Sequence, residues 1–586
     1  MNKFEWNLKD IYQTEEGFKQ DVLKFYDKMN EIKNYQGTLN QGVEQIYNCY
    51  KLYEETIRIE EKLYSYAMLN YHKDMSNVEA IKLYKEVEKN VTDFAEAVSF
   101  IEPEISKIPE DKLKEYVKSH KLQEFKKSLQ DILKGKKHIL SEEVERVISK
   151  YSEVFGVSES VYDTFTTTEF EFNNIKEDDG KDLKMTHGLY SKYLRNPSEN
   201  VRKQAFESMY ELYKKHINSI TDLYLSRVKK TTISANIRNY KSSMEMTTDA
   251  DDSSVDVYNT LIKEVNKNLD LNHQYIELKR KLLNVDKLHM YDVYLNTFDL
   301  EDDKIEYEEA KQTVLEALSI LGEEYINKLK EAFDNNWLDV YETPNKMTGA
   351  YSMGVYGVHP YVLLNFINSS RDISTIAHEL GHSMHSYYAN NSQNSINANY
   401  TIMVAEVAST VNEILLASYL IDKEQDKIKK AALINEQLDM IRATLYRQAM
   451  FAEFEKEVHG KIESGESLTS ENLNDIYYKL VEKYFGPSCI IDDLIKYEWA
   501  RIPHFYSCFY VYKYATGITS AIVIASKILA GEEGYKEKYI NMLSKGGSEG
   551  SLDLLKSVEV DLEKEETYEI AFKYFRKRLE ELINLG

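Results

Sequence analysis

Apolar positions recur at helical spacing along most of this chain. From about Leu8 to Asp131, amphipathic segments alternate with short polar breaks, such as residues 34–37 and 103–109. Helical periodicity resumes after Asn196-Pro197-Ser198, where Ser198 is a candidate N-cap, and it dominates to about residue 340. The pattern predicts a mostly α-helical protein.

The helical pattern continues from Ser370 to the end of the chain. It is interrupted at Gly486-Pro487 and at the glycine-rich residues 546–550, which are unsuited to a helix interior. Few breakers occur elsewhere, since the whole chain has only 7 prolines and 22 glycines. We therefore expect long helices joined by short connections.

Two regions have the alternation of β-strands instead. Residues 166–172 alternate, break at Asp178-Asp179-Gly180 and continue at 183–185, which predicts a β-hairpin. Residues 348–366 combine glycines with β-branched and aromatic residues and end in Tyr361–Phe366. This second region predicts a small sheet beside the helix that follows it.

The length of the chain implies more than one packed lobe. A chain of 586 residues with 42% hydrophobic and 29% charged residues can bury a large interior, but compact domains usually have about 100–200 residues. We predict a helical N-terminal lobe at 1–190, with the hairpin near its end, and a catalytic domain at 191–586.

Charge and cysteine content narrow the classes of function. The net charge of -24 repels a phosphate backbone, so nucleic-acid binding is not expected. The three cysteines are widely separated, which favours a reducing compartment. Neither a signal peptide nor an apolar run of about 18 residues is evident, so we expect a soluble cytoplasmic protein without a membrane partner.

The main candidate for chemistry is an H-E-x-x-H motif at residues 378–382. On a helix, His378 and His382 lie one turn apart on the same face and can bind a single metal ion. Glu379 projects about 100° away around the helix, where it can act on a water molecule as a general base without ligating the metal. Zinc is the expected cofactor, as one ion, although other divalent metals accept similar ligands.

A third protein ligand is expected because catalytic zinc sites commonly have three and leave a position for water. Glu406 lies in the apolar segment 400–413, where a carboxylate needs a cation to offset its burial. Glu413, seven residues later on the same face, is a candidate to orient a ligand histidine. A surface glutamate and a plain salt bridge are the competing interpretations of these two residues. His385 is interpreted as a histidine that either packs in the core or supports the metal ligands without contacting the metal.

Beyond this motif, the sequence resembles the oligoendopeptidase F family, a branch of the thimet-oligopeptidase-like zinc peptidases. The resemblance is carried by residues 349–352, 360–365, 378–383, 405–410, 502–506 and 510–517, and by the opening Trp6–Tyr12. It therefore spans nearly the full length of the chain.

The resemblance implies a mostly helical, two-lobed ellipsoid with the zinc in a deep substrate channel, which cleaves short peptides internally. It also implies that Tyr361–Phe366 is an edge strand pairing with the substrate backbone. Gly349, Tyr361 and Leu363 are thus expected to bind substrate.

A C-terminal cluster resembles the donors that stabilise the oxyanion in such enzymes. His504, Tyr510 and Tyr514 are the candidates, and His504 and Tyr514 are also expected to contact substrate. Tyr506, Tyr510 and Tyr514 are four residues apart, which predicts one helical face. Core packing is the competing interpretation, because the chain has 46 tyrosines.

Two other functions remain open at this point. An exopeptidase on the same scaffold, such as a peptidyl-dipeptidase or a carboxypeptidase, would need a cation to hold a peptide terminus, and Arg371 and Arg501 are candidates. A non-catalytic helical peptide-binding protein would use the histidines only for packing.

Overall fold

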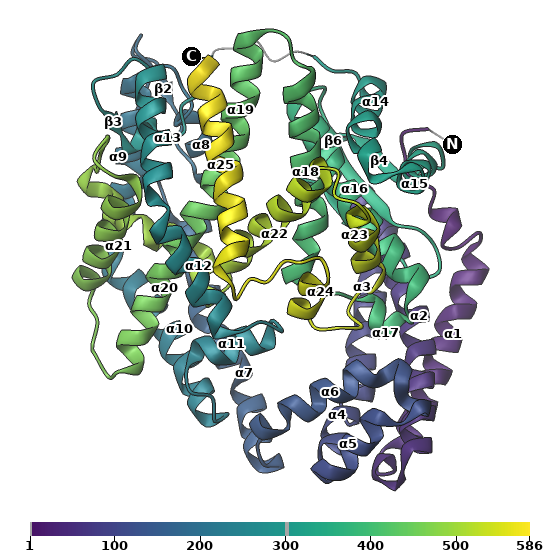
Figure 1. Cartoon of the computed structure of the whole chain (residues 1–586). Coiled ribbons are helices and arrows are strands. Elements are labelled where there is room, and N and C mark those ends of the chain that lie inside the picture. Colours follow the sequence, from purple (N-terminus) through teal and green to yellow (C-terminus); the bar gives the residue numbers. More distant parts are fainter. Residues whose placement is uncertain (1–2, 299–303, 586) are drawn as a thin grey trace. The chain divides into compact units, whose positions relative to one another are not determined.

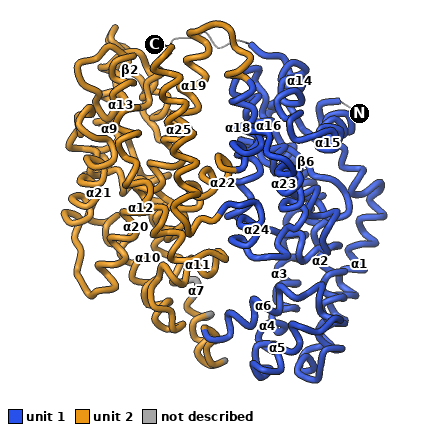
Figure 2. The backbone as a smooth tube through the Cα atoms, viewed as in Figure 1, with its two compact units in different colours: residues 1–137, 302–419, 524–560 blue, residues 138–301, 420–523, 561–586 orange. Residues whose placement is uncertain are grey.

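The computed structural model describes residues 3–298 and 304–585 (Figure 1). The protein is 73% helical with 4% strand, which confirms the predicted mostly α fold with a small sheet. Contacts divide the chain into two compact units, each built from three segments (Figure 2). Unit 1 comprises residues 1–137, 302–419 and 524–560, and unit 2 comprises 138–301, 420–523 and 561–586. The domain division predicted at residue 190 and the predicted channel stay predictions.

Unit 1 contains an N-terminal helical layer, a three-stranded sheet and the helices that carry the H-E-x-x-H motif. Its helices are α1 (Glu15–Ile32), α2 (Val43–Lys73), α3 (Val78–Val98), α4 (Ile101–Ser106), α5 (Glu110–Lys118), α6 (Lys126–Gly135), α14 (Tyr307–Ala317), α15 (Glu323–Asp334), α16 (Ser370–Ser392), α17 (Ser395–Ala398), most of α18 (Ile402–Lys423), α23 (Tyr535–Ser544) and α24 (Ser551–Ser557). Its strands are β4 (Leu338–Tyr341), β5 (Tyr351–Met353) and β6 (Tyr361–Phe366).

Unit 2 is a helical assembly with two short strand pairs. Its helices are α7 (Glu142–Thr164), α8 (His187–Tyr193), α9 (Glu199–Lys215), α10 (Ile217–Ile237), α11 (Ser243–Ala250), α12 (Val255–Lys267), α13 (Leu269–Leu282), α19 (Lys427–Ile441), α20 (Arg447–Glu463), α21 (Ser470–Phe485), the first part of α22 (Tyr512–Leu529) and α25 (Glu565–Leu585). The strands are β1 (Ile175–Lys176) paired with β2 (Asp182–Leu183), and β3 (Leu288–His289) paired with β7 (Cys489–Ile490).

The sheet of unit 1 has the strand order β4-β6-β5. β6 is parallel to β4 and antiparallel to β5, with Tyr351 opposite Leu363 and Met353 opposite Tyr361. Tyr361 and Leu363 belong to the core formed with the N-terminal helices. Alternate residues of a strand face opposite sides, so Val362 and Leu364 lie on the face that contacts α16. The sheet therefore connects the N-terminal helical layer to the motif helix.

The expectation that Tyr361–Phe366 is an edge strand is wrong. β6 is the central strand, with neighbours on both sides, and the side chains of Tyr361 and Leu363 are fully buried. β4, which helical periodicity concealed, covers one side of β6, and the Val340 N–H donates in turn to the carbonyl of Phe4 at 2.9 Å. Within the part of the chain that the structure describes, β5 pairs with β6 and with no other strand.

The motif helix α16 forms for local reasons. Its N-cap is Ser369, and Asp372 completes a capping box because its carboxylate accepts a hydrogen bond from the Ser369 N–H. Ile373, Ala377, Leu380 and Met384 form an apolar stripe along the helix, and all four are buried. The histidine pair is thus presented by a helix that is fixed at its start and along one face.

A hairpin forms in the predicted region, but its first strand lies after the predicted residues 166–172. Residues 175–176 pair with 182–183 around a turn that contains Gly180 at a φ of 89°. Residues 166–169, predicted to be strand, extend α7 as a π-helical turn instead. Ser198 caps α9 as predicted, accepting a hydrogen bond from the Val201 N–H.

One helix, α18, is long and apolar enough to cross a membrane by length and composition. However, 61% of its most apolar window is buried inside the protein, as in the core helix of a globular protein. This burial accounts for the apolar composition of α18. The same helix also carries the carboxylates of Glu406 and Glu413.

Candidate functional site

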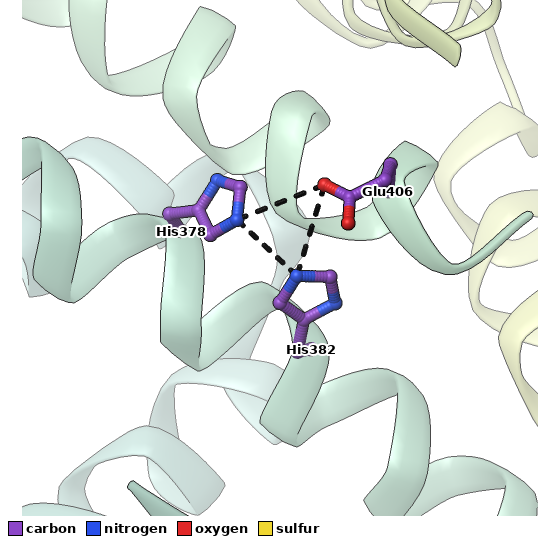
Figure 3. Close-up of side chains that lie close together, drawn as sticks. All are labelled: His378, His382 and Glu406. Carbon is purple, nitrogen blue, oxygen red and sulfur yellow. Dashed lines mark hydrogen bonds and ion pairs between the residues drawn. The ribbon is translucent and has the colours of Figure 1, made fainter. Parts of the chain in front are cut away.

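Three predicted ligands converge in unit 1. His378 and His382 from α16 and Glu406 from α18 point toward one another (Figure 3). The Nε2 atoms of the two histidines are 3.2 Å apart, and Glu406 Oε2 lies 3.8 Å from His378 Nε2 and 3.9 Å from His382 Nε2. Ligand atoms about 2.0–2.2 Å from a tetrahedral zinc ion are separated by distances of this size.

Glu413 lies behind the first of these histidines. Glu413 lies seven residues, or about two helical turns, beyond Glu406 on α18, and its carboxylate accepts a hydrogen bond from His378 Nδ1. With the Nδ1 proton held in this way, Nε2 of the neutral ring presents its lone pair to His382 and Glu406. Glu413 thus lies where it can fix both the orientation and the tautomer of His378.

The pKa values of the two imidazoles are shifted in opposite directions. Burial lowers the pKa of His378, but the hydrogen bond to Glu413 and the charges of Glu413, Glu379 and Glu406 outweigh it and leave that pKa raised. Burial and the nearby His378 lower the pKa of His382 to about 4. His382 is therefore neutral at neutral pH, as a metal ligand must be.

Glu379 is 6% exposed and adjoins the first histidine. Burial raises its pKa to about 7; the charge of His378 opposes this shift, and Glu406 and Glu413 add to it. A carboxyl group with a pKa in this range can both accept and donate a proton near neutral pH.

The donor set fits a divalent metal ion. Two imidazole nitrogens and one carboxylate oxygen are typical zinc ligands, and three ligands leave a further coordination position open. In the neutral histidine pair, lone pairs of three acceptor atoms face a common point, so a proton or a metal ion has to lie among them. Among the described residues, these three form the cluster able to hold a metal ion.

Asn412 is a site residue that the sequence interpretation missed. It is fully buried on α18; its Nδ2 donates to the carbonyl of Ala377 at 3.0 Å, and its Oδ1 accepts from Tyr325 at 3.1 Å. Ala377 precedes His378 and Asn412 precedes Glu413, so two adjacent hydrogen bonds join the helices. A buried asparagine in an apolar segment beside a predicted ligand was the available signal.

His385 and His359 do not belong to the metal cluster. His385 is buried and stacks on Tyr400, with ring centroids 3.6 Å apart. His359 stacks on Trp337 at 4.8 Å. The stacking of His385 agrees with its interpretation as a packing residue.

The candidate oxyanion donors lie in unit 2 and form a cluster of their own. Tyr514 OH is 3.3 Å from His504 Nε2, and the rings of Tyr510 and Tyr514 meet edge to face at 5.5 Å. His504 is exposed, whereas both tyrosines are partly exposed. Burial still lowers the pKa of His504, which favours the neutral ring.

The predicted single helical face for Tyr506, Tyr510 and Tyr514 is wrong. Tyr506 ends a 3-10 helix at Pro503–Tyr506, is buried and stacks on Tyr162 at 4.3 Å. α22 begins only at Tyr512. For Tyr506 the core-packing interpretation holds, while His504, Tyr510 and Tyr514 are brought together by a chain reversal.

Gly349 lies in the turn directly before β5, with a φ of 83° that favours glycine. The Asn365 side chain holds this turn, because its Nδ2 donates to the carbonyls of Met347 at 2.9 Å and Gly349 at 2.7 Å. On the motif side, the hydroxyl groups of Ser352 and Ser383 are 2.8 Å apart. β5 is thus attached both to β6 and to α16.

Two family models match the chain. The model described as "Peptidase family M3" matches residues 192–574, and the model described as "Oligopeptidase F" matches residues 104–172. Together they include the motif helix, the segment containing Glu406 and the cluster around His504.

Individual proteins match over nearly the full length. The chain is 37% identical to Oligopeptidase PepF of Bacillus subtilis, over 99% of this chain and 87% of that protein. It is 35% identical to an oligoendopeptidase F homolog of Borreliella burgdorferi, over 98% and 97%.

Solved structures show the same fold. A peptidase from Chlamydophila abortus matches with a TM-score of 0.95 and 32% identity, covering 100% of this chain and 98% of that one. The oligoendopeptidase-F of Enterococcus faecium matches with a TM-score of 0.74 and 33% identity, covering 97% and 99%.

Proposed function

Because the chain belongs to peptidase family M3 and is a metallo-oligopeptidase of that family, we propose that it is a zinc-dependent endopeptidase that hydrolyses short peptides at internal bonds. The observation that carries the proposal is the convergence of His378 Nε2, His382 Nε2 and Glu406 Oε2 at distances of 3.2–3.9 Å, with Glu379 beside them. The names of the relatives support peptides as substrates.

In this proposal His378, His382 and Glu406 hold one zinc ion. When bound there, zinc would lower the pKa of a water molecule and polarise the peptide carbonyl. Glu379 takes a proton from the attacking water on its carboxylate and passes it to the nitrogen of the leaving amine. Its pKa of about 7 suits both transfers.

His504, Tyr510 and Tyr514 supply donors to the oxyanion that develops on the scissile carbonyl. Their mutual contacts support this role, because an N–H or O–H group held by a neighbour is already oriented when charge develops. His504 and Tyr514 contact the substrate at the same time.

Substrate binding is assigned to β5 in place of β6. A peptide that adds as a further strand to Tyr351–Met353 would be held by backbone hydrogen bonds, which tolerate many side chains. Gly349 permits the turn that leads into β5. Tyr361 and Leu363 of the central strand β6 pair with β5, so they contribute to substrate binding by keeping β5 in place and not by contacting the peptide.

The proposal is tested by separating metal binding from turnover. Glu379→Gln keeps the three ligands and removes the base, so zinc content should stay at one ion per chain while cleavage of an internally quenched peptide falls at least about a thousandfold. Near-normal turnover by this variant would refute the role of Glu379. Glu406→Gln should instead lower zinc content, and an unchanged stoichiometry would remove Glu406 from the ligands.

The exopeptidase alternative requires a cation that can hold a peptide terminus. Arg501 is occupied in a buried ion pair, since its Nη2 lies 3.5 Å from Glu498 Oε1 and its guanidinium stacks over Tyr190. Arg371 is exposed in the first turn of α16. An endopeptidase should cleave a peptide whose two ends are blocked at the same internal bond, whereas an exopeptidase should lose activity on it.

We also propose that the protein acts in the cytoplasm, where its three free buried cysteines stay reduced. The division into an N-terminal lobe at 1–190 and a catalytic domain at 191–586 remains part of the proposal. A catalytic domain in this sense would still depend on residues 1–137, which belong to the same compact unit as the motif helix and pack against its sheet.

A further inference from the structure

The donor cluster of unit 2 depends on a reversal of the chain at Phe509. This residue lies between the 3-10 helix Pro503–Tyr506 and α22, and it has a φ of 57°. A residue as bulky as phenylalanine is an outlier in this left-handed region, because its Cβ atom crowds the backbone. The reversal brings Tyr514 back against His504, ten residues earlier in the chain.

Glu455 holds the backbone at this point. The Phe509 N–H donates to Glu455 Oε1 at 2.8 Å, and Glu455 on α20 is fully buried. Its second oxygen, Oε2, has no hydrogen-bond partner among the described residues. Burial raises the pKa of Glu455 well above its ordinary value, and the hydrogen bond from the Phe509 N–H opposes this shift only in part.

The Phe509 side chain packs against aromatic residues of α20 and α12. Its ring lies 4.4 Å from that of His459, one helical turn after Glu455, and 5.5 Å from that of Tyr258. His459 is itself fixed, since its Nδ1 is 3.1 Å from the hydroxyl of Ser243. The ring and the N–H of Phe509 are therefore both held by α20.

Asp251 fixes the chain on the other side of the reversal. Its Oδ1 accepts from Lys513 Nζ at 2.6 Å, and its Oδ2 accepts from Tyr512 OH at 3.3 Å. These two residues directly precede Tyr514. Tyr514 is thus positioned by an ion pair as well as by the reversal.

Several unfavourable local features are concentrated at one point outside the metal cluster. A phenylalanine has a positive φ, and a carboxyl oxygen of Glu455 and Nε2 of His459 are buried without a hydrogen-bond partner in the part of the chain that the structure describes. Such features persist where the surrounding structure enforces them, and they cluster at functional sites. The feature they maintain here is the meeting of His504 with Tyr510 and Tyr514.

We propose that Glu455 is a positioning residue for the oxyanion donors, acting through the Phe509 N–H to hold the reversal that places Tyr514 against His504. This inference rests on the proposed donor role of Tyr514. It predicts that a change at Glu455 affects turnover only while the donors are present.

The test is a double-mutant cycle on the zinc-loaded, full-length enzyme. Glu455→Leu should lower kcat about tenfold to a hundredfold with little change in KM or zinc content, whereas Glu455→Gln, which keeps an acceptor oxygen, should retain most of the activity. Tyr514→Phe should lower kcat by itself. Adding Glu455→Leu to Tyr514→Phe should lower kcat no more than about twofold further, because the group being positioned is already absent.

A matched control corrects for loss of packing in α20. Met450 is fully buried on the same helix and away from Phe509, so Met450→Ala should lower the unfolding midpoint while leaving kcat within about twofold. If Tyr514→Phe alone leaves kcat unchanged, the donor role fails and this inference fails with it. If Tyr514→Phe lowers kcat and Glu455→Leu lowers it by the same factor in both backgrounds, the donor role stands and positioning by Glu455 is overturned.

A second pair of variants applies where Glu455→Leu is not recovered folded. Phe509→Gly and Phe509→Ala both remove the ring and differ only in the Cβ atom, which a positive φ disfavours. Phe509→Gly should keep a several-fold higher kcat than Phe509→Ala at equal zinc content. Equal kcat values for the two would show that the reversal is not what sets turnover.

Discussion

Gly381 on α16 lies directly against the backbone of Ser409 on α18, where the two helices that carry the metal ligands are in close contact. A Cβ atom on Gly381 would come within 2.5 Å of Ser409 Cα and 2.7 Å of the Ala408 carbonyl oxygen. Both are backbone positions, so neither can yield by a side-chain rotation. The absence of a side chain at Gly381, inside the H-E-x-x-H motif, therefore sets how near α18 and its Glu406 come to His378 and His382.

The first prediction follows from this contact. Gly381→Ala should push α18 away from α16 and move Glu406 from the histidines, with an overpacking cost of about 1–3 kcal/mol, or about a tenfold to hundredfold loss of zinc affinity. Competition with a chelator of known affinity measures it directly. Turnover should recover at saturating zinc more than it does for Glu406→Gln.

Gly460→Ala is the matched control for this substitution. A Cβ atom on Gly460 in α20 meets nothing within 4 Å, so alanine should leave zinc affinity unchanged and raise stability by up to about 1 kcal/mol. An unchanged zinc affinity in Gly381→Ala as well would mean that the helix spacing does not set the ligand geometry.

The helices α16 and α18 show which features of the site could be predicted from the sequence and which could not. The spacing of His378 and His382 on one helix and the apolar segment that carries Glu406 are local properties that the sequence shows, but the Glu406 side chain is 40% exposed and not buried as expected. Gly381 and Asn412 were missed because their roles exist only across the contact between two helices. No periodicity within one helix shows which glycine meets a neighbouring backbone.

The position of β6 in its sheet and the conformation of residues 506–514 also depend on tertiary contacts that the local sequence does not show. β6 has the alternation of a strand, but its central position depends on β4, whose four residues are too short to separate from a helical pattern. The four-residue spacing of Tyr506, Tyr510 and Tyr514 suggested one helix, and the positive φ of Phe509 breaks it. Propensity disfavours that conformation, so tertiary contacts had to determine it.

The second prediction concerns Glu413. Glu413→Gln keeps an oxygen that can accept from His378 Nδ1 but removes the charge that strengthens this bond, so zinc affinity should fall about tenfold, with a larger fall for Glu413→Leu. Zinc content during dialysis against graded chelator checks both values. Asp422→Asn, an exposed carboxylate on the same helix, should leave the affinity unchanged. Equal zinc affinities in the unmodified protein and the three variants would show that Glu413 forms an ion pair with no effect on metal binding.

The third prediction is a pH dependence of stability in unit 2. Burial alone would raise the pKa of Glu498, but the charges of Arg447 and Arg501, with hydrogen bonds from Arg447 at 2.7 Å and Tyr477 at 2.6 Å, lower it to about 2. A lowered carboxyl pKa means that the stabilisation is complete above the ordinary pKa of 4.5 and is lost as the pH falls from there toward 2. The contribution is on the order of 3 kcal/mol.

Glu498→Gln should therefore lower the unfolding midpoint strongly at pH 7, and its deficit relative to the unmodified protein should shrink as the pH falls below about 4.5. Thermal unfolding between pH 3 and pH 7 measures this convergence. Glu559→Gln is the control: the pKa of Glu559 is lowered to about 2 as well, by hydrogen bonds from Lys527 and Lys538, but at an exposed site where ion pairs add little stability. Parallel curves for Glu498→Gln and the unmodified protein would contradict the prediction.

The last prediction tests substrate binding along β5, and it uses altered peptides with the unmodified enzyme. A strand added to Tyr351–Met353 would direct every second backbone N–H of the peptide toward β5 and the others away from it. Replacing a single N–H by N-methyl removes one donor, so methylation at alternate positions should raise KM about fivefold to tenfold, as expected for one lost hydrogen bond.

Methylation at the intervening positions of the same peptide is the internal control, with the same added volume and no lost contact to β5. A KM that rises equally at successive positions, or at none, would show that the peptide does not add to this strand, because steric crowding and side-chain recognition lack the two-residue period that the strand imposes.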